Sequence, residues 1–283
     1  MADITAAMVM KLRDETGLPM MDCKKALQEA GGDLELAKQK VRETGKKIMS
    51  IRQDRTTEEG RIAAYSTLKP PVGAIIELQV ESAPVAKHEE VVGLANDLAK
   101  QLATGPGAKT PEDLWKQPAP SRKGTTLEQW KDEIEGKMRE VLRLARIARI
   151  DAPSGSYVHH DAKSGVLLVV DGGNDELAKN IAMHVAAMKP KATNTAELDK
   201  AMVDKERAIL TEQARKEGKP ENIIEKMIEG RLRNFYAEHV LAEQPFVKDD
   251  KQSVGKVASA GGMKLVKFVR WQLGETSGEK PAA

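Results

Sequence analysis

The sequence predicts an α+β fold, with helical segments and short strands in separate blocks of the chain. The chain begins with three short helical segments that are separated by glycines. The order strand, tight turn, strand, helix then occurs twice, which predicts a core of two related subdomains. After the second of these units, apolar residues recur at helical spacing on both sides of a turn. That pattern is typical of an antiparallel helical hairpin.

The three N-terminal helices are delimited by glycines and by a capping residue. The first is predicted from Thr5 to Thr16, and the second covers "MMDCKKALQEA" before Gly31–Gly32. Asp33 can accept hydrogen bonds at the start of the third helix, which is predicted to end at Gly45. Helices this short are marginally stable alone, so we expect them to share one compact core.

Two β-hairpins, each followed by a helix, form the predicted core. In the first unit a turn at Lys69–Gly73 with two prolines joins two strands. In the second unit the turn is at Ala162–Gly165, and the helix that follows stops before Pro190. The predicted strands are 61–68 and 73–80 in the first unit and 155–161 and 165–172 in the second, with helices at 88–104 and 174–188.

The segment that joins the two units contains a loop and an arginine-rich stretch. Residues 105–125 are rich in Pro, Gly and Lys and predict a loop with a short helix around Trp115. Residues 126–150 are predicted to be helical. Four arginines alternate there with apolar residues: Arg139, Arg143, Arg146 and Arg149. This helix is the best candidate for nucleic-acid binding, or else an amphipathic helix whose arginines face solvent; no aromatic platform accompanies it.

The helical hairpin is predicted within residues 195–240, with its turn at Glu217–Pro220. Apolar residues on both of its helices permit self-association, so a homodimer through the hairpin is a possibility that the sequence leaves open. The following "MKLVKFVRWQL" predicts a strand that pairs with the second β-hairpin. The last residues, "GETSGEKPAA", are predicted to be disordered.

Composition limits the function classes. The 283 residues carry a formal net charge of only +2, and this argues against a dedicated nucleic-acid binder. The start of the chain lacks the pattern of a signal peptide, and the longest apolar run, "GVLLVV", is far shorter than the roughly 18 to 20 residues of a membrane span. A single cysteine excludes an intrachain disulfide. We therefore expect a soluble, cytoplasmic protein without membrane contact.

No residue pattern in the chain predicts an enzyme. A glycine-rich phosphate loop and a dinucleotide-binding fingerprint are both missing from the sequence, so no cofactor is expected. His159 and His160 would face opposite ways as neighbours on a strand and could not share a metal ion. Cys23, in the middle of a predicted helix, is interpreted as a small core residue in preference to a reactive thiol.

One stretch carries a family resemblance. "GLPMMDCKKALQEAGGDLELA", residues 17–37, closely resembles the N-terminal signature of elongation factor Ts, the nucleotide-exchange factor of the GTPase elongation factor Tu. Further matches follow in order along nearly the whole chain. They are "VAK" at 85–87, "GSYVHH" at 155–160, "IAMHVAAMKP" at 181–190, "GKPENIIEKMIEGRLRNFY" at 218–236 and "QPFVKDD" at 244–250.

The resemblance implies a domain organisation and a partner. It implies a ubiquitin-associated-like three-helix domain at 1–50, a core N-subdomain at 56–140, and a core C-subdomain at 141–283 with the hairpin inserted at 194–240. The implied partner is elongation factor Tu, both GDP-bound and nucleotide-free, and the implied activity is promotion of GDP release. Such a factor is no enzyme itself; it binds the empty GTPase better than the loaded one, and by linkage each ligand weakens the other.

The resemblance also implies contact residues. Arg13, Met20, Met21 and Lys24 match N-terminal residues that contact the partner, and His159 matches a partner-contacting histidine on the second hairpin. Met20 and Met21 open a helix, where flexible thioethers suit a binding surface, but both could instead lie in the core. His159 could equally be an ordinary surface histidine.

The chain departs from the family at the loop that disturbs the partner's Mg²⁺ site. Where the family has Thr-Asp-Phe-Val, this sequence has Ser82, Ala83, Pro84 and Val85. Ser82 is expected to cap the next helix, whereas Ala83 has no carboxylate and Pro84 offers only a small rigid ring. Pro84 could act as a lesser wedge, the partner's pocket could have changed to match, or exchange could be lost and a chaperone-like binding role remain.

Two rival functions belong to other classes. The first 45 residues alone would allow a ubiquitin-associated-type binding module with extra domains. The arginine-rich segment would allow RNA binding, which steep salt dependence would reveal. The core units and the hairpin that follow the first helices favour the exchange factor.

Overall fold

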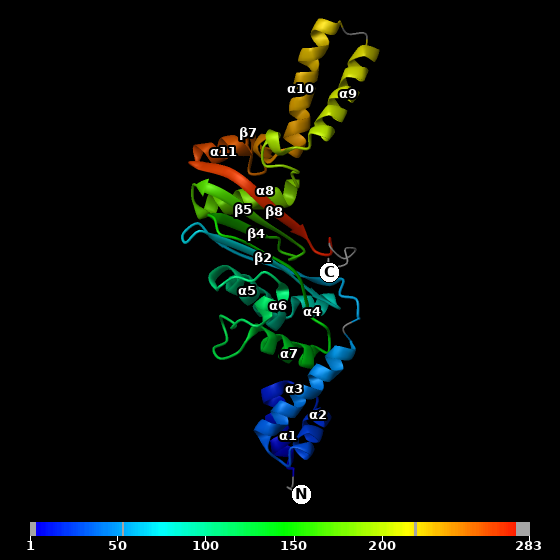
Figure 1. The fold of residues 1–283 in the computed structure, drawn as a ribbon, viewed down its shortest axis with the longest axis vertical. Helices are drawn as coiled ribbons and strands as arrows, with labels where there is room; N and C mark the ends of the chain where they lie inside the picture. Colours follow the sequence, from blue (N-terminus) through cyan, green and yellow to red (C-terminus); the bar gives the residue numbers. More distant parts are fainter. Residues whose placement is uncertain (1–3, 53, 218–219, 276–283) are drawn as a thin grey trace. The chain divides into compact units, whose positions relative to one another are not determined.

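The computed structural model describes residues 4–52, 54–217 and 220–275, with the backbone alone for 45–50 and 221–222. The chain is α+β with an N-terminal three-helix region, as predicted (Figure 1). Its internal contacts form two compact units. The first comprises Met1–Tyr65, Ala74–Arg149 and Gln272–Ala283, and the second comprises Ser66–Gly73 and Ile150–Trp271. The finer three-domain division implied by the resemblance stays a prediction.

The three-helix region consists of α1 (Ala6–Thr16), α2 (Met20–Glu29) and α3 (Leu34–Ile51). The end of α1 and the start of α3 are formed by the residues predicted for them, a glycine and a capping aspartate. Gly17 takes a left-handed conformation (φ 69°), and Asp33 Oδ1 accepts a hydrogen bond from the Leu36 N–H at 3.0 Å. The shared core contains Val9, Leu12, Cys23, Ala26, Leu27, Ala30 and Ala37.

The third helix is longer than predicted, because it runs through Gly45 to Ile51. A glycine inside a helix costs about 1 kcal/mol relative to alanine, which does not end a helix whose neighbours favour it. Gly45 is followed by good helix formers, "KKIM", and no proline stands beside it. The prediction of a stop at Gly45 was therefore wrong.

The sheet of the first unit has the order β1–β2–β3, from β1 (Glu59–Thr67), β2 (Val72–Val80) and β3 (Arg143–Ile150). Every residue of the central strand β2 is buried. Besides α1, α2 and α3, the unit contains α4 (Ala83–Lys87), α5 (Glu89–Thr104), α6 (Pro111–Trp115) and α7 (Leu127–Met138). The hairpin β1–β2, the helix after it and the short helix at Trp115 confirm the predictions for this region.

The helix predicted for residues 126–150 is confirmed in its first half by α7, whereas its arginine-rich second half is not helical. Helix α7 ends at Met138, the next residue Arg139 adopts a left-handed conformation (φ 59°), and β3 begins at Arg143. Arg146 Nε donates to buried Glu77 Oε2 at 2.7 Å, and Arg149 Nη1 donates to the carbonyls of Leu102 and Gly105. Arg146 and Arg149 thus bind other residues of the same unit. This arrangement differs from both predicted roles, nucleic-acid binding and a solvent-facing helix surface.

The second unit is built on the sheet β4–β5–β8, from β4 (Ser154–Val158), β5 (Ser164–Gly172) and β8 (Met263–Gln272). Strands β4 and β5 pair antiparallel from Ser154↔Val169 to Val158↔Gly165. The unit also contains α8 (Asp175–Met188), α11 (Val254–Ala260), β6 (Pro245–Phe246) and β7 (Asp249–Ser253). The second β-hairpin, its helix and the pairing with the last strand were predicted correctly.

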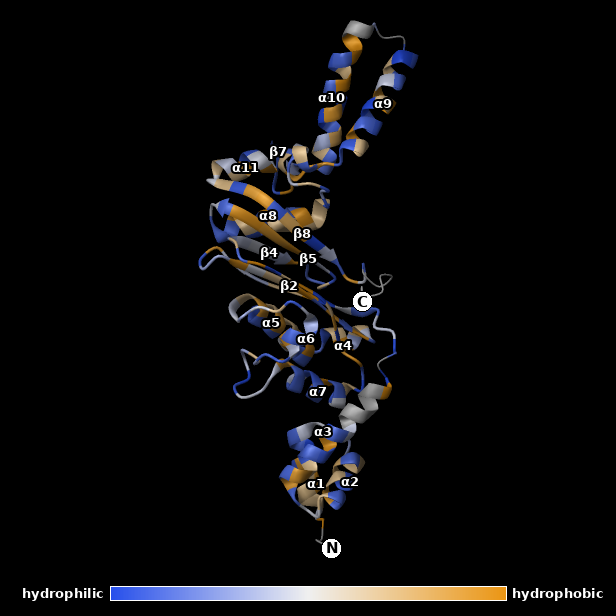
Figure 2. Cartoon of the chain, in the orientation of Figure 1, coloured by the Kyte–Doolittle hydropathy of each residue, from blue (hydrophilic) through white to orange (hydrophobic). Residues whose placement is uncertain are grey.

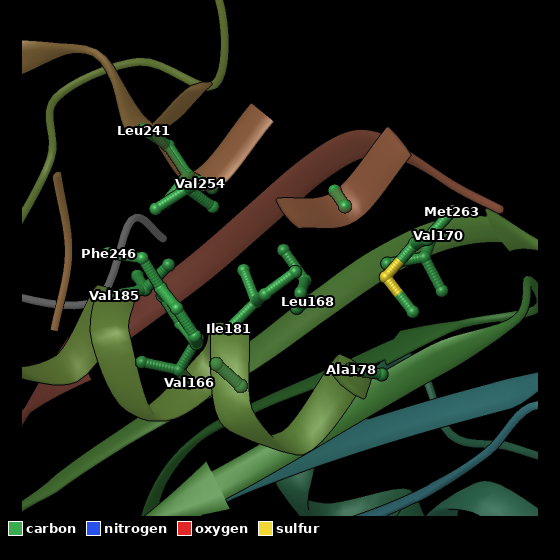
Figure 3. Packing of buried hydrophobic residues seen from close by; sticks show 12 residues of the cluster. Val166, Leu168, Val170, Ala178, Ile181, Val185, Leu241, Phe246, Val254 and Met263 are labelled. Atoms are coloured by element: carbon green, nitrogen blue, oxygen red, sulfur yellow. The ribbon is translucent and has the colours of Figure 1, made fainter. Parts of the chain in front are cut away.

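The core of the second unit lies where α8, β5 and α11 meet, and Figure 3 shows its side chains gathered there. Leu168 and Ile181 are completely buried, and Phe246 is 6% exposed. The labelled members are Val166, Leu168, Val170, Ala178, Ile181, Val185, Leu241, Phe246, Val254 and Met263. Burial of apolar side chains on this scale is the main driving force that holds the unit together.

The predicted helical hairpin is confirmed as α9 (Lys200–Lys216) and α10 (Glu221–His239). Polar and apolar residues alternate along both helices (Figure 2). The apolar faces pack together through Leu210, Ala214, Ile224, Ile228 and Leu232. The middle of the predicted turn, Gly218–Lys219, lies outside the described residues, as does most of the tail that was predicted to be disordered. Among the described helices, none is long and apolar enough to cross a bilayer.

Candidate partner-binding site

The loop Ser82–Val85 forms the start of a single helical turn that follows the central strand β2. Ser82 is extended (φ −133°, ψ 150°), and α4 begins at Ala83 with Pro84 in its first turn. A proline suits this place because its fixed φ fits a helix and its missing N–H has no partner to lose there. Pro84 is exposed, whereas Ala83 and Val85 are half-buried. The loop therefore presents the proline ring to solvent.

Ser82 does not cap α4 with its side chain, contrary to the expectation from the sequence. Its hydroxyl instead donates to Glu140 Oε1 at 2.6 Å, and its backbone N–H donates to Glu140 Oε2 at 3.0 Å. One carboxylate thus holds both donors of Ser82. Hydrogen bonds to an ionised acceptor are stronger than neutral ones, so this contact fixes the base of the loop.

The residue before the loop is fixed in a similar way. Glu81 Oε1 accepts from the Val141 N–H at 2.9 Å, and Glu81 Oε2 accepts from Arg55 Nη1 at 2.8 Å. Burial alone would raise the pKa of Glu81, but these two partners outweigh burial and lower the pKa. Glu81 therefore remains a carboxylate that ties β2 to the segment after α7.

Ala86, which follows the loop, is held by a hydrogen bond from Arg61 on β1. Its Nη1 donates to the Ala86 carbonyl at 2.9 Å, and burial lowers the pKa of this guanidinium. The Ala86 N–H in turn donates to the Ser82 carbonyl at 3.1 Å. The turn that carries the exposed ring of Pro84 is therefore hydrogen-bonded at both of its ends.

The predicted contact residues of the three-helix region are all exposed. Met20 and Met21 are 40% and 73% exposed at the start of α2, so the alternative that both lie in the core is wrong. Arg13, in the last turn of α1, and Lys24 on α2 are exposed as well. Two thioethers and two cations on one small helical region suit contact with another protein.

Cys23, between these residues in sequence, faces inward and confirms the core interpretation. It is completely buried, and its thiol lies 3.7 Å from the Leu18 carbonyl oxygen. Burial raises the pKa of the Cys23 thiol, so the reactive thiolate is disfavoured.

The segment after α7 connects the three-helix region to the loop. Arg139 Nη2 donates to Asp22 Oδ2 at 2.6 Å, and Arg52 Nη1 donates to the Arg139 carbonyl at 2.7 Å. Asp22 directly follows Met21, and Arg139 directly precedes Glu140. A groove of about 690 Å³ lies beside these contacts, and Asp22, Arg52 and Arg139 belong to its lining.

His159 belongs to the second unit and is half-buried just after β4. Its Nδ1 lies 3.3 Å from the Tyr157 hydroxyl, and its ring centroid lies 4.2 Å from that of exposed His160. The expectation that the two imidazoles face opposite ways was wrong, because the strand ends at Val158. Among the residues that the structure describes, no group of three His, Cys, Asp or Glu side chains could hold a metal ion.

The sequence alone did not reveal the residues that fix the loop. Ser82 and Glu140 are 58 positions apart, and Asp22 and Arg139 are 117 apart. A single sequence gives no signal for pairs so distant, since each residue is charged or polar in an ordinary polar context. The loop itself was found only through its departure from the family pattern.

The exposed methionines and the fixed surface turn describe an α+β protein that is suited to binding another protein. Residues 81–275 match the family described as elongation factor TS. The chain is 42% identical to "Elongation factor Ts" of Azoarcus sp. (strain BH72) over 278 residues, which cover 97% of this chain and 92% of the relative. It is 41% identical to "Elongation factor Ts" of Methylococcus capsulatus over 275 residues, with 96% and 92% covered. The chain belongs to the elongation factor Ts family of translation elongation factors.

Proposed function

We propose that this protein binds elongation factor Tu and promotes the release of GDP from it, so that GTP can follow. Membership of the elongation factor Ts family supports the proposal, together with one structural observation: Pro84 is exposed on a turn that is fixed at both ends. The protein acts as an exchange factor on a partner GTPase and is not itself an enzyme. The cytoplasmic location expected from the sequence fits this role.

The mechanism that we propose is a competition for the nucleotide pocket. The partner holds GDP with the help of Mg²⁺ bridging the phosphates. The loop Ser82–Val85 enters beside that site and disturbs it mechanically, because Ala83 carries no carboxylate and Pro84 supplies a compact ring. Since the turn is already ordered, little conformational entropy is lost when it docks. Binding energy is thus available to weaken the contacts to Mg²⁺ and phosphate.

The three-helix region supplies affinity in this proposal. Met20 and Met21 offer adaptable apolar surface, and Arg13 and Lys24 offer charge to an acidic patch of the nucleotide-binding domain. His159 adds a contact from the second unit. The factor binds both the GDP-loaded and the empty partner, and it binds the empty one more tightly. By linkage, binding of the factor then lowers the affinity of the partner for GDP, which favours GDP release.

A release assay tests the proposal directly. Catalytic amounts of the protein are mixed with the elongation factor Tu of the same species, preloaded with a fluorescent GDP analogue, and chased with excess GDP. We expect release to accelerate with the amount of factor, and each factor molecule to act on many partners. A rate equal to that in buffer would refute the exchange function.

The second candidate is a non-catalytic, chaperone-like partner of elongation factor Tu, which the missing carboxylate and aromatic ring favour. It predicts a stable complex in a pull-down from lysate without accelerated release. A ubiquitin-associated-type module predicts instead that other proteins dominate the pull-down.

Self-association through the hairpin also belongs to the proposal. Ile209 and Ile223 are 42% and 45% exposed on α9 and α10, and in this proposal they form the apolar centre of a homodimer contact. Light scattering of the purified protein with and without Ile209→Glu distinguishes a dimer from a monomer.

A further inference from the structure

The short segment between α7 and β3 contacts the loop and the three-helix region at the same time. We propose that Glu140 and Arg139 are positioning residues for nucleotide exchange. Glu140 orients the loop Ser82–Val85, and Arg139 links that orientation to α2, where Met21 is exposed. The inference rests on the proposed function, because it assigns the residues that prepare the same surface for the partner.

The geometry at Glu140 is that of a clamp on a single residue. Its two oxygens accept the hydroxyl and the N–H of Ser82 at 2.6 and 3.0 Å, and the site is partly buried. Burial limits competition from water and screening by salt, so the contact is stronger than one at the surface. Because Ser82 precedes α4 directly, its orientation sets the direction in which Pro84 points.

The backbone at Arg139 is unusual for its residue type. Arg139 has φ 59° and ψ 26°, the left-handed region that glycine adopts most readily. An arginine here carries a conformational cost, and its side chain makes the contact to Asp22 at 2.6 Å. A residue held in an unfavourable conformation while making a specific long-range contact points to a function for that side chain.

The Asp22–Arg139 contact and the Glu140–Ser82 contact are coupled, because Arg139 and Glu140 are neighbours in the chain. A displacement of α2 acts on Asp22, then on Arg139, and through one peptide bond on Glu140 and the loop. The Arg52 contact to the Arg139 carbonyl, at 2.7 Å, holds the backbone between them. A partner that engages Met21 therefore also acts on the orientation of Pro84.

The first test uses the free protein and needs no exchange activity. Hydrogen exchange of the Ser82 amide is compared between wild type and Glu140→Gln, with Glu128→Gln on the exposed side of α7 as the control for charge. Glu140→Gln removes the charge and one of the two acceptor oxygens, which predicts exchange about tenfold faster at the Ser82 amide. Unchanged protection in Glu140→Gln would overturn the clamp.

The second test separates the link from the fold. Arg139→Gly removes the contact to Asp22 and relieves the backbone, so we expect an equal or higher melting temperature. Arg139→Lys keeps a cation that can reach Asp22. The maximal GDP release rate should fall severalfold in the glycine variant and largely recover in the lysine variant, while the half-saturating concentration changes little. A glycine variant with the wild-type maximal rate would overturn the link.

The two proposals fail in different ways. If wild-type protein does not accelerate GDP release, the proposed function fails, and hydrogen exchange at Ser82 still decides whether Glu140 holds the loop. If wild type is active while Glu140→Gln keeps both its protection and its maximal rate, the exchange function stands and the positioning role is refuted.

Discussion

At the scale of single residues, the loop Ser82–Val85 has no charged side chain of its own. The carboxylate of Glu140 contacts its first residue, and its exposed residue carries an apolar ring. Glu140 lies beneath Ser82, whereas the exposed residue is Pro84 and its neighbour Ala83 has no polar group. The sequence indicated only that an acid and an aromatic ring were missing. The structure adds that the residues on both sides of the remaining ring, Ser82 and Ala86, are hydrogen-bonded to Glu140 and Arg61.

The rigidity of Pro84 can be tested by substitution. Pro84→Gly frees the backbone of the turn, and the entropy difference, roughly 0.4 to 1 kcal/mol, corresponds to a loss of about two- to fivefold in the GDP release rate. Pro111→Gly is the matched control, because Pro111 also stands in the first turn of a short helix and lies outside the proposed site. Equal rates for the two variants would show that the stiffness of the loop is irrelevant.

His184 predicts a pH dependence of stability. Its Nδ1 accepts from the Val247 N–H at 3.2 Å, so its Nε2–H donates to Gln244 Oε1 at 2.9 Å. Burial lowers the pKa of His184 below its usual 6.5, although the Gln244 contact opposes this. Between the lowered pKa and 6.5, only the unfolded chain binds the proton. The contribution of neutral His184 to the free energy of unfolding is therefore constant above pH 6.5 and is lost as the pH falls below that value.

Thermal unfolding of wild type and His184→Gln between pH 7.5 and 5.5 measures this effect. We expect wild type to lose more of its melting temperature over that range than the variant does. The comparison between variants is needed because burial also raises the pKa of Glu135 above 4.5. That shift makes the folded state more stable as the pH falls toward 4.5, which opposes the effect of His184. Identical slopes would contradict the assignment of a buried neutral His184.

At the scale of elements, periodicity predicted most helices and both β-hairpins, and failed at one charged strand. Residues 143–150 contain apolar and arginine side chains in an order that fits a helical stripe as well as a strand. Long arginine stems can lie along a buried surface while their charged ends reach partners, as Arg146 does with Glu77. The partners of these arginines are distant in sequence, so only the fold could show that β3 completes a sheet.

The ion pair between β2 and β3 predicts a large effect on stability. Glu77 is completely buried, and Arg146 Nη2 lies 2.7 Å from it. Arg146→Ala leaves a buried carboxylate without its cation, which typically costs about 3 to 5 kcal/mol. Denaturant unfolding should therefore show a strong loss for Arg146→Ala and recovery when Glu77→Gln is added.

The control for this prediction lies in the same unit. Lys100 on α5 is exposed, and Lys100→Ala should change the free energy of unfolding by no more than about 0.5 kcal/mol. If Arg146→Ala and Lys100→Ala were equally mild, the pair would contribute no more than a surface salt bridge.

At the scale of the whole molecule, the predicted contact residues are distributed over both units. The loop and the methionines belong to the first unit and His159 to the second. The family resemblance predicted these residues, while the contacts of Arg139 with Asp22 and of Glu140 with Ser82 required the folded chain.

Whether the loop has changed together with its partner can be decided by restoring the family pattern. Ala83→Asp with Pro84→Phe should accelerate GDP release from an elongation factor Tu whose own factor carries Thr-Asp-Phe-Val, because that pocket accommodates an acid and a large ring. The same double variant should give no gain on the partner from its own species if that pocket is adapted to proline. The two single variants serve as controls, since an acid without the ring should recover only part of the rate. No gain on either partner would show that exchange by this protein does not depend on the loop.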